Sequence, residues 1–98
     1  MLLKVHLHFP DCASLKAKRS ELNPVKAWLR QRLSAAVAEV GHQDSWQRST
    51  LAVALSGDSP ARCDQGADAI DRFLEERFPY GVRTERVVTS WNDLQSMG

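Results

Sequence analysis

Two segments of this sequence carry apolar residues along one side only, at the spacing of an α-helix. The first begins after Ser14 and the second begins at Pro60, after Ser59, and both serines suit the N-cap position. The apolar positions are Leu15, Leu22, Val25, Leu29 and Leu33 in the first segment and Cys63, Ala67, Ile70, Leu74 and Phe78 in the second. A helix with a single apolar stripe must bury that stripe against another layer. Both helices are therefore predicted to cover one face of a sheet.

Pro24 interrupts the first of these helical segments. It either kinks one continuous helix or separates two helices, the second with Asn23 as its cap and Pro24 in its first turn. We favour one kinked helix.

Four other segments have the character of β-strands. Leu2–Phe9 alternates between apolar and polar residues, which predicts a half-buried strand with one solvated face. Ala35–Val40 and Arg48–Ser56 are close in sequence and predict an antiparallel hairpin. Val82–Trp91 predicts a last strand. The order βαββαβ predicts a ferredoxin-like α+β fold, in which two helices lie on one face of a four-stranded antiparallel sheet.

Size and composition limit the functions of the chain. Its 98 residues suffice for one domain, residues 1–98, in which Asn92–Gly98 is expected to fray. A formal net charge of +1 gives no overall attraction to polyanions, so binding to nucleic acid or a membrane surface would depend on a local patch. Cys12 and Cys63 are far apart, and Met1–Phe9 is too short and too polar for a signal peptide or a membrane span. These features predict a cytoplasmic protein with reduced thiols and no membrane association.

The segment between the second and third predicted strands carries an unusual set of side chains. A plain turn would consist mostly of Gly, Asn, Ser and Pro. Here the candidate site residues are Glu39, His42, Gln43, Asp44, Trp46 and Arg48. Two interpretations stay open. The residues form a corner that binds a ligand, or they lock the fold, with Asp44 orienting His42. In the second case Arg48 pairs with an acid and Trp46 covers the end of the core.

Two motifs, Ser14–Ser20 and Glu39–Arg48, resemble the YlxP-like family, a small bacterial family known chiefly as a domain of unknown function. The resemblance covers nearly the whole chain and implies a ferredoxin-like fold, in agreement with the pattern of strands and helices. In some bacteria the gene of this family lies among translation and ribosome-maturation genes, which implies a connection with RNA or the ribosome. Gly41 stands where the family pattern has an acidic residue, and Ser45 stands where an aliphatic residue is usual.

Three basic residues lie at the start of the first predicted helix. The helix dipole disfavours cations at this end, so Lys16, Lys18 and Arg19 suggest a bound anion such as an RNA phosphate. Alternatively Lys18, which lies close to the apolar stripe, extends over the core and pairs with Glu39 or Asp44. Both alternatives stay open.

Catalytic and metal-binding chemistry have less support. His6 and His8 have a spacing compatible with two metal ligands, but no Cys or carboxylate at a fixed position completes a site. Cys12 precedes a helix and His42 could act as a base, yet no spacing connects the two. We therefore expect no catalytic residues, no metal and no cofactor.

Two functions of different classes remain. In the first, the protein is a non-catalytic module that binds RNA or a ribosomal subunit. Its candidate contacts are Lys16, Lys18, Arg19 and Arg48 on phosphates and Trp46 stacked on a base, with Arg83 and Arg86 of the last strand as further options. In the second, it is an interaction protein, such as a homodimer, that uses the open sheet face or an edge strand. The family context favours the first.

Overall fold

The computed structural model describes residues 1–79 and 81–87 and confirms the predicted order of elements. The elements are β1 (Leu2–His8), α1 (Leu15–Leu33), β2 (Ala36–Gly41), β3 (Arg48–Ala54), α2 (Pro60–Arg77) and β4 (Val82–Val87). The part of the last strand predicted beyond Val87, and the frayed end predicted from Asn92, lie outside the described residues.

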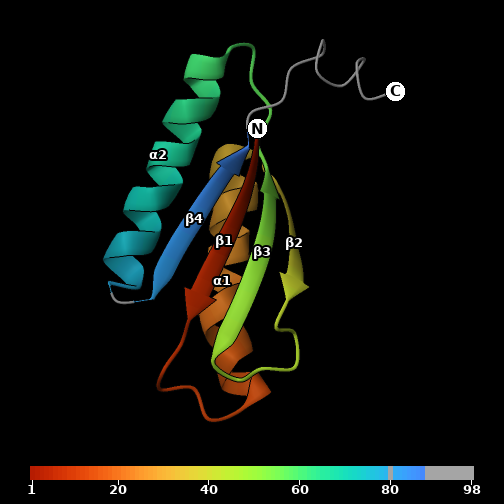
Figure 1. The fold of residues 1–98 in the computed structure, drawn as a ribbon, viewed down its shortest axis with the longest axis vertical. Helices are drawn as coiled ribbons and strands as arrows, with labels where there is room; N and C mark the ends of the chain where they lie inside the picture. The colour runs from red at the N-terminus through yellow and green to blue at the C-terminus, as the bar shows by residue number, and fades with distance from the viewer. Residues whose placement is uncertain (80, 88–98) are drawn as a thin grey trace.

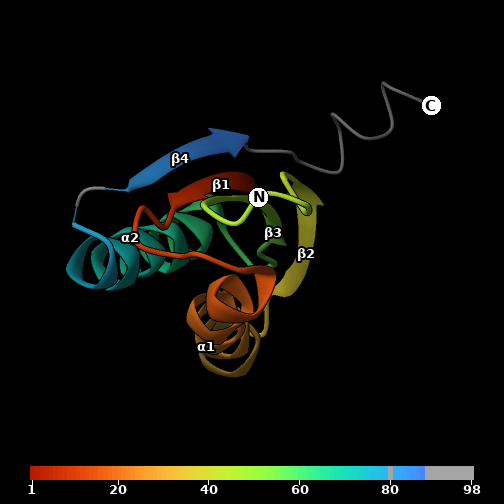
Figure 2. The same cartoon turned by 90° about the horizontal axis from the view of Figure 1, so that it is seen from below.

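All four strands belong to one antiparallel sheet with the order β2-β3-β1-β4. Both helices lie on the same side of this sheet, and no other element of residues 1–79 and 81–87 covers the opposite face (Figure 1 and Figure 2). The predicted ferredoxin-like arrangement is therefore confirmed. Neither helix in the described part of the chain is long and apolar enough to cross a membrane.

Helix α1 is a single helix that runs through Pro24. The Ser14 hydroxyl caps its start by accepting a hydrogen bond of 3.0 Å from the Ala17 N–H. Leu22, before the proline, and Val25, after it, are both buried in the same core. This shared burial keeps the two halves of the helix together although Pro24 cannot donate a backbone hydrogen bond.

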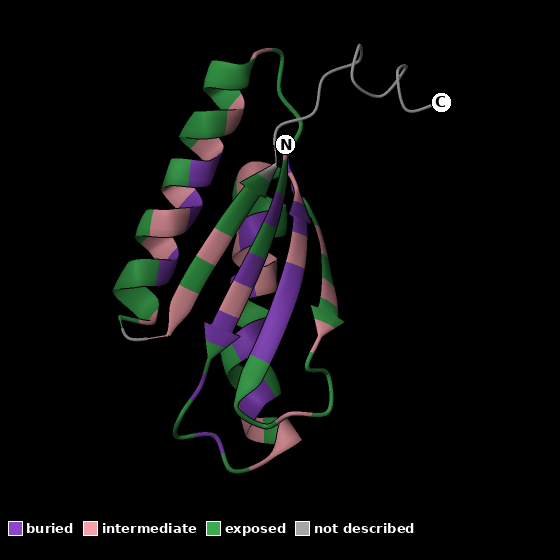
Figure 3. Cartoon of the chain, in the orientation of Figure 1, coloured by how far each residue is buried: buried purple, intermediate pink, exposed green. Residues whose placement is uncertain are grey.

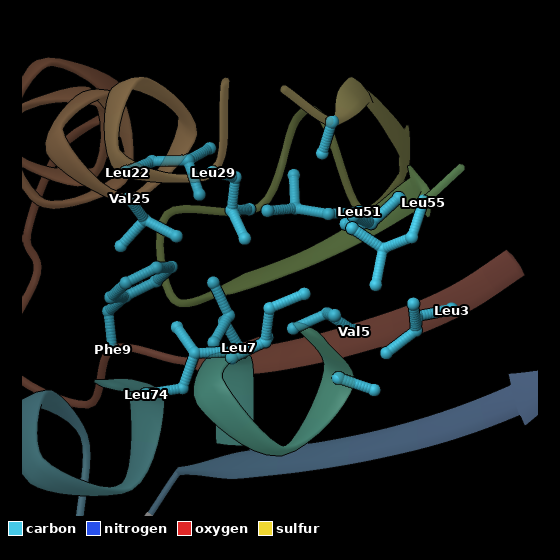
Figure 4. Packing of buried hydrophobic residues seen from close by; sticks show 14 of the residues in the cluster. Leu3, Val5, Leu7, Phe9, Leu22, Val25, Leu29, Leu51, Leu55 and Leu74 are labelled. Carbon is cyan, nitrogen blue, oxygen red and sulfur yellow. The ribbon is translucent and has the colours of Figure 1, made fainter. Parts of the chain in front are cut away.

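The core lies between the sheet and the helices. Because side chains alternate along a strand, Leu3, Val5 and Leu7 of β1 point toward the helices. Figure 4 shows these side chains in contact with residues of α1, α2 and β3. The fully buried members from these three elements include Val25, Leu29, Leu51, Val53, Ile70 and Leu74. Figure 3 shows that burial is concentrated on the two central strands and on the helix sides that meet them.

On its helix-facing side, β4 is attached to α2 through charged and polar groups. The Arg86 guanidinium contacts the carboxylates of Asp71 and Asp68, and Thr84 Oγ1 donates a hydrogen bond of 3.0 Å to Asp71. The hydrogen bonds to Asp71 and Asp68 raise the pKa of Arg86 above its usual value. Arg86 was one of the options for binding RNA, and two carboxylates of α2 already contact its guanidinium.

The strand register places the remaining β1 side chains on the open face. His6 lies opposite Thr50 of β3 and Arg83 of β4, and His8 lies opposite Arg48. Lys4 and Ala52 form another pair on the same face, as predicted from the alternation. Thr50 is nevertheless only 4% exposed, because His6 Nδ1 lies 3.1 Å from its hydroxyl and Gly41 of β2 packs against its other side.

Candidate functional site

The loop between β2 and β3 is held in place by a buried lysine. Lys18 of α1 is 2% exposed, and its ammonium group donates hydrogen bonds to the backbone carbonyls of His42 at 2.7 Å and Ser45 at 2.8 Å. The same Nζ atom lies 3.1 Å from Glu39 Oε2. An ammonium group has three N–H donors, and these three acceptors use all of them. Lys18 is therefore unable to bind a phosphate, and the alternative in which it pairs with Glu39 is confirmed.

Glu39, which lies on β2, is the acidic partner of Lys18 in this group. Its Oε2 atom accepts a hydrogen bond of 2.7 Å from the Ser49 hydroxyl in addition to its contact with Lys18. Burial alone would raise the pKa of Glu39, but the hydrogen bonds from Ser49 and Lys18 and the charges of Lys18 and Lys26 outweigh it and hold the pKa below its ordinary value. We call Lys18, Glu39 and Ser49 the lysine lock. It joins α1, β2 and β3 to the loop.

The lysine lock sets the conformation of the loop. His42 adopts a left-handed backbone with φ of 60°, and its carbonyl accepts hydrogen bonds from Lys18 and from the Ser45 N–H. Gln43 donates through its amide to the Glu39 carbonyl at 3.3 Å. The loop is thus fixed mainly through backbone carbonyls, which side-chain patterns in the sequence do not reveal.

The side-chain network proposed for this loop does not form as expected. Within residues 1–79 and 81–87, no hydrogen bond joins Asp44 to His42 and no acid pairs with Arg48. Trp46 is 53% exposed and does not cover the core. The loop is locked by Lys18 and Glu39 instead. Its own side chains, His42, Asp44, Trp46 and Arg48, remain exposed to solvent.

Two other basic residues of the predicted site lie at the start of α1. Lys16 and Arg19 are exposed, and no acidic residue occupies the first turn of this helix. Figure 1 shows that the start of α1 and the β2–β3 loop lie at the same end of the molecule. Arg19 borders a shallow hollow that it shares with Asp44 and Glu39, so its surroundings carry both signs of charge.

The three histidines of the chain meet in one place. A hollow of about 370 Å³ on the open face is lined by residues of β1, β3 and β4 and of the loop before β3. Its basic lining residues are His6, His8, His42, Arg48 and Arg83. In the described part of the chain, no carboxylate side chain lines it. We call this feature the histidine hollow.

The sequence predicts only part of the histidine hollow. The alternation of β1 places His6 and His8 on one face, but the sequence contains no signal that brings His42, Arg48 and Arg83 to them. That proximity depends on the register of β1 with both neighbours and on the left-handed turn at His42. Among the described residues, no group of three or more His, Cys, Asp or Glu side chains is arranged to hold a metal ion.

Comparisons with known proteins assign the family. The model of the family described as "Protein of unknown function (DUF503)" matches residues 1–86. The chain belongs to this family. It is also similar to the "Uncharacterized protein YlxP" of Bacillus subtilis (strain 168), with 28% identity over 74 residues that cover 76% of this chain and 79% of that protein. The resemblance deduced from the two motifs is therefore confirmed.

One departure from the family pattern has a structural explanation. Gly41 follows a register shift in the β2–β3 pairing, and a Cβ atom at this position would lie 3.1 Å from the Thr50 Cβ. An acidic side chain would require Thr50 to shift. The glycine therefore allows Thr50 to lie between β2 and His6.

Cys12 lacks the surroundings of an activated nucleophile. Its side chain is buried, and burial together with the charges of Glu21 and Asp11 raises the pKa of its thiol. A thiol with a raised pKa carries less of the reactive thiolate at neutral pH.

The lysine lock predicts a pH-dependent stability. Because the folded-state pKa of Glu39 lies below its ordinary value of 4.5, the ionised carboxylate stabilises the fold above that pH, and this contribution disappears as the pH falls through the folded-state pKa. We expect Glu39→Gln to lower the free energy of unfolding by about 2 kcal/mol at neutral pH. Lys18→Met should lower it by about 3–5 kcal/mol, because it breaks a buried pair.

Urea unfolding between about pH 7 and pH 3 measures this effect. The difference between the native protein and Glu39→Gln should shrink on acidification. Glu76→Gln, an exposed position on α2, is the matched control and should change little. A difference for Glu39→Gln that stays constant across the range would contradict the role of its ionised form.

Proposed function

We propose that this protein binds RNA through phosphate groups and does so without catalysing a reaction. The observation that carries the proposal is the position of Arg48 and Arg83, which are both exposed on the open face and border the histidine hollow. Guanidinium groups bind phosphate oxygens through paired hydrogen bonds. The translation setting implied by the family resemblance makes ribosomal RNA the first RNA to test.

The proposed contact surface differs from the set deduced from the sequence. Lys18 is not part of this surface because its N–H donors bond to groups inside the fold. Arg86 is not part of it because carboxylates of α2 neutralise its charge. Lys16, Arg19, Arg48 and Arg83 remain. With a net charge of only +1, the protein must rely on such a local surface.

Trp46 is the candidate for base stacking. Domains of this topology that bind single-stranded RNA commonly stack bases on aromatic residues of the open sheet face. The described strands place no Phe, Tyr or Trp side chain on that face, where the central pairs are His6–Thr50 and Lys4–Ala52. Trp46, half-exposed on the loop beside Arg48, offers an aromatic surface instead, and stacking on it would tolerate different base sequences.

Neutralising the two arginines tests the proposal. We expect Arg48→Gln with Arg83→Gln to weaken binding of a single-stranded RNA that carries hydroxyl groups at both ends. The slope of log K against log salt should become shallower by about 0.7 for each phosphate that the protein no longer neutralises. Fluorescence anisotropy over a salt series measures both quantities. Arg72→Gln, an exposed arginine on α2, is the matched control.

If the native protein fails to bind such RNA at low salt, or if the double variant binds with the same salt slope, the assignment of this surface is wrong. Circular dichroism establishes that the variants remain folded. The two arginines are exposed, so their replacement should leave the fold intact.

The start of α1 gives a prediction in which stability and binding change in opposite directions. Lys16 lies in the first turn, where the helix dipole disfavours a positive charge. We expect Lys16→Glu to stabilise the fold by about 0.5 kcal/mol. The same change, alone or with Arg19→Glu, should weaken RNA binding. Thermal unfolding and anisotropy on the same samples measure both. Unchanged RNA affinity would remove the helix start from the contact surface.

A second candidate function is homodimerisation through the other end of the open face. Small apolar residues form a shallow depression there, which we call the alanine floor: Leu2, Ala36, Ala38, Ala52 and Ala54. Leu2 is 51% exposed. Lys4 lies beside this floor and directly opposite Glu85. A copy related by two-fold symmetry could pair these opposite charges across the interface, since such a face meets itself.

Sedimentation of the native protein at high micromolar concentration tests this second candidate. If the protein is a dimer through the alanine floor, Ala38→Glu should shift it to a monomer because it buries a charge in the interface. Ala61→Glu, an exposed alanine at the start of α2, is the matched control and should leave the dimer intact. A monomeric native protein at these concentrations would exclude the candidate.

A further inference from the structure

The histidine hollow differs from a groove that follows an RNA backbone. It lies over the end of β1, with His6 and His8 rising from this central strand. Arg48 stands on β3 opposite His8, and Arg83 stands on β4 opposite His6. Because neighbouring strands are about 4.8 Å apart, the backbones of β3 and β4 are separated by about 10 Å across β1. Arg48 and Arg83 therefore border the hollow from the strands on either side of β1.

His42 closes a third side of the hollow. Its left-handed backbone and the hydrogen bonds to its carbonyl fix the position from which its ring borders the hollow. Within the described residues, the rings of His8 and His42 have no hydrogen-bond partner. Both ring nitrogens of His6 have a partner, since Nδ1 lies 3.1 Å from Thr50 Oγ1 and Nε2 lies 3.5 Å from Glu85 Oε2. Donors are thus available on three sides of the hollow.

We propose that this hollow binds the terminal phosphate monoester of an RNA, an inference that rests on the RNA binding proposed above. A phosphodiester within a chain offers two free oxygens and one negative charge. A terminal monoester offers three free oxygens and a charge of about −1.5 to −2 at neutral pH. Two guanidinium groups and imidazole donors from a third direction match three oxygens on one phosphorus better than the two of a diester.

Glu85 is the one acidic side chain that opposes this ligand at close range in the described structure. Its Oε2 lies 3.5 Å from His6 Nε2, and its Oε1 lies 3.8 Å from an Arg83 guanidinium nitrogen. Both distances are long for an ion pair. Glu85 therefore reduces the positive charge at the rim and engages His6 Nε2 and Arg83 only through long contacts. Replacing it by Gln should make the hollow more attractive to a phosphate.

The test compares three versions of one short RNA by fluorescence anisotropy at constant salt: a 5′-phosphate, a 3′-phosphate and hydroxyl groups at both ends. We expect at least one phosphorylated version to bind about tenfold more tightly than the version with two hydroxyl ends. The preferred version identifies which end is bound. Arg83→Gln should remove the preference, Glu85→Gln should enlarge it, and Arg72→Gln should leave it unchanged.

The outcomes separate this inference from the proposed function. If the native protein binds all three RNAs with equal affinity, RNA binding stands and the terminal-phosphate site is wrong. If the folded protein binds none of them, both are wrong. A preference that survives Arg83→Gln, or that fails to grow in Glu85→Gln, would overturn the assignment to this hollow. Arg83 and Glu85 are both exposed, so their replacement should not prevent folding.

Discussion

The buried ammonium of Lys18 is the interaction on which the rest of this structure depends. Removing a positive charge from water is costly unless close partners replace its hydration. Here one carboxylate and two backbone carbonyls do so, and each comes from a different point along the segment between β2 and the loop. A weaker contact of 3.4 Å to the Gln43 carbonyl lies nearby. The first helix, the second strand and the loop are thereby fixed relative to one another, and so are the side chains that the loop presents to solvent.

The charges on β4 divide according to the face on which they lie. On the helix side, Arg86 is surrounded by carboxylates of α2, so it attaches strand to helix. On the open side, the one ion pair of Arg83 with another described residue is a distant contact with Glu85, and Arg83 borders the histidine hollow. The two arginines are three residues apart in a strand, and the alternation of side chains is enough to give them different roles. Of these two arginines, the one on the open face is therefore the one that an anion could reach.

Two features of the edge strand β2 oppose pairing with a foreign strand. Arg30 of α1 donates a hydrogen bond of 3.0 Å to the Val37 carbonyl, which satisfies a backbone acceptor that a foreign strand would otherwise use. The register shift between Glu39 and Gly41 then disturbs the pairing geometry near the end of the strand. Ala36 and Ala38 of β2, which belong to the alanine floor, are exposed.

The sequence by itself determined the order and type of the elements. Two single-sided apolar stripes and four short strand segments permit few arrangements, and the alternation in β1 already assigns His6 and His8 to the solvated face. The apolar positions on both sides of Pro24 favoured one helix without excluding a break there, and the structure shows a single α1. The sequence also identifies Lys18 and Glu39 as partners in one of two alternatives, since a lysine beside an apolar stripe can extend over the core.

Only the tertiary structure decided which basic residues are free to bind a ligand. The sequence does not name the acidic and backbone groups that occupy Lys18 and Arg86, whereas the structure shows these partners and shows Lys16 and Arg83 exposed. The assembly of three histidines and two arginines in one hollow depends on strand register and on backbone carbonyls that hold a left-handed turn. Register and backbone hydrogen bonds join residues that are distant along the chain, and no local pattern of side chains encodes that proximity.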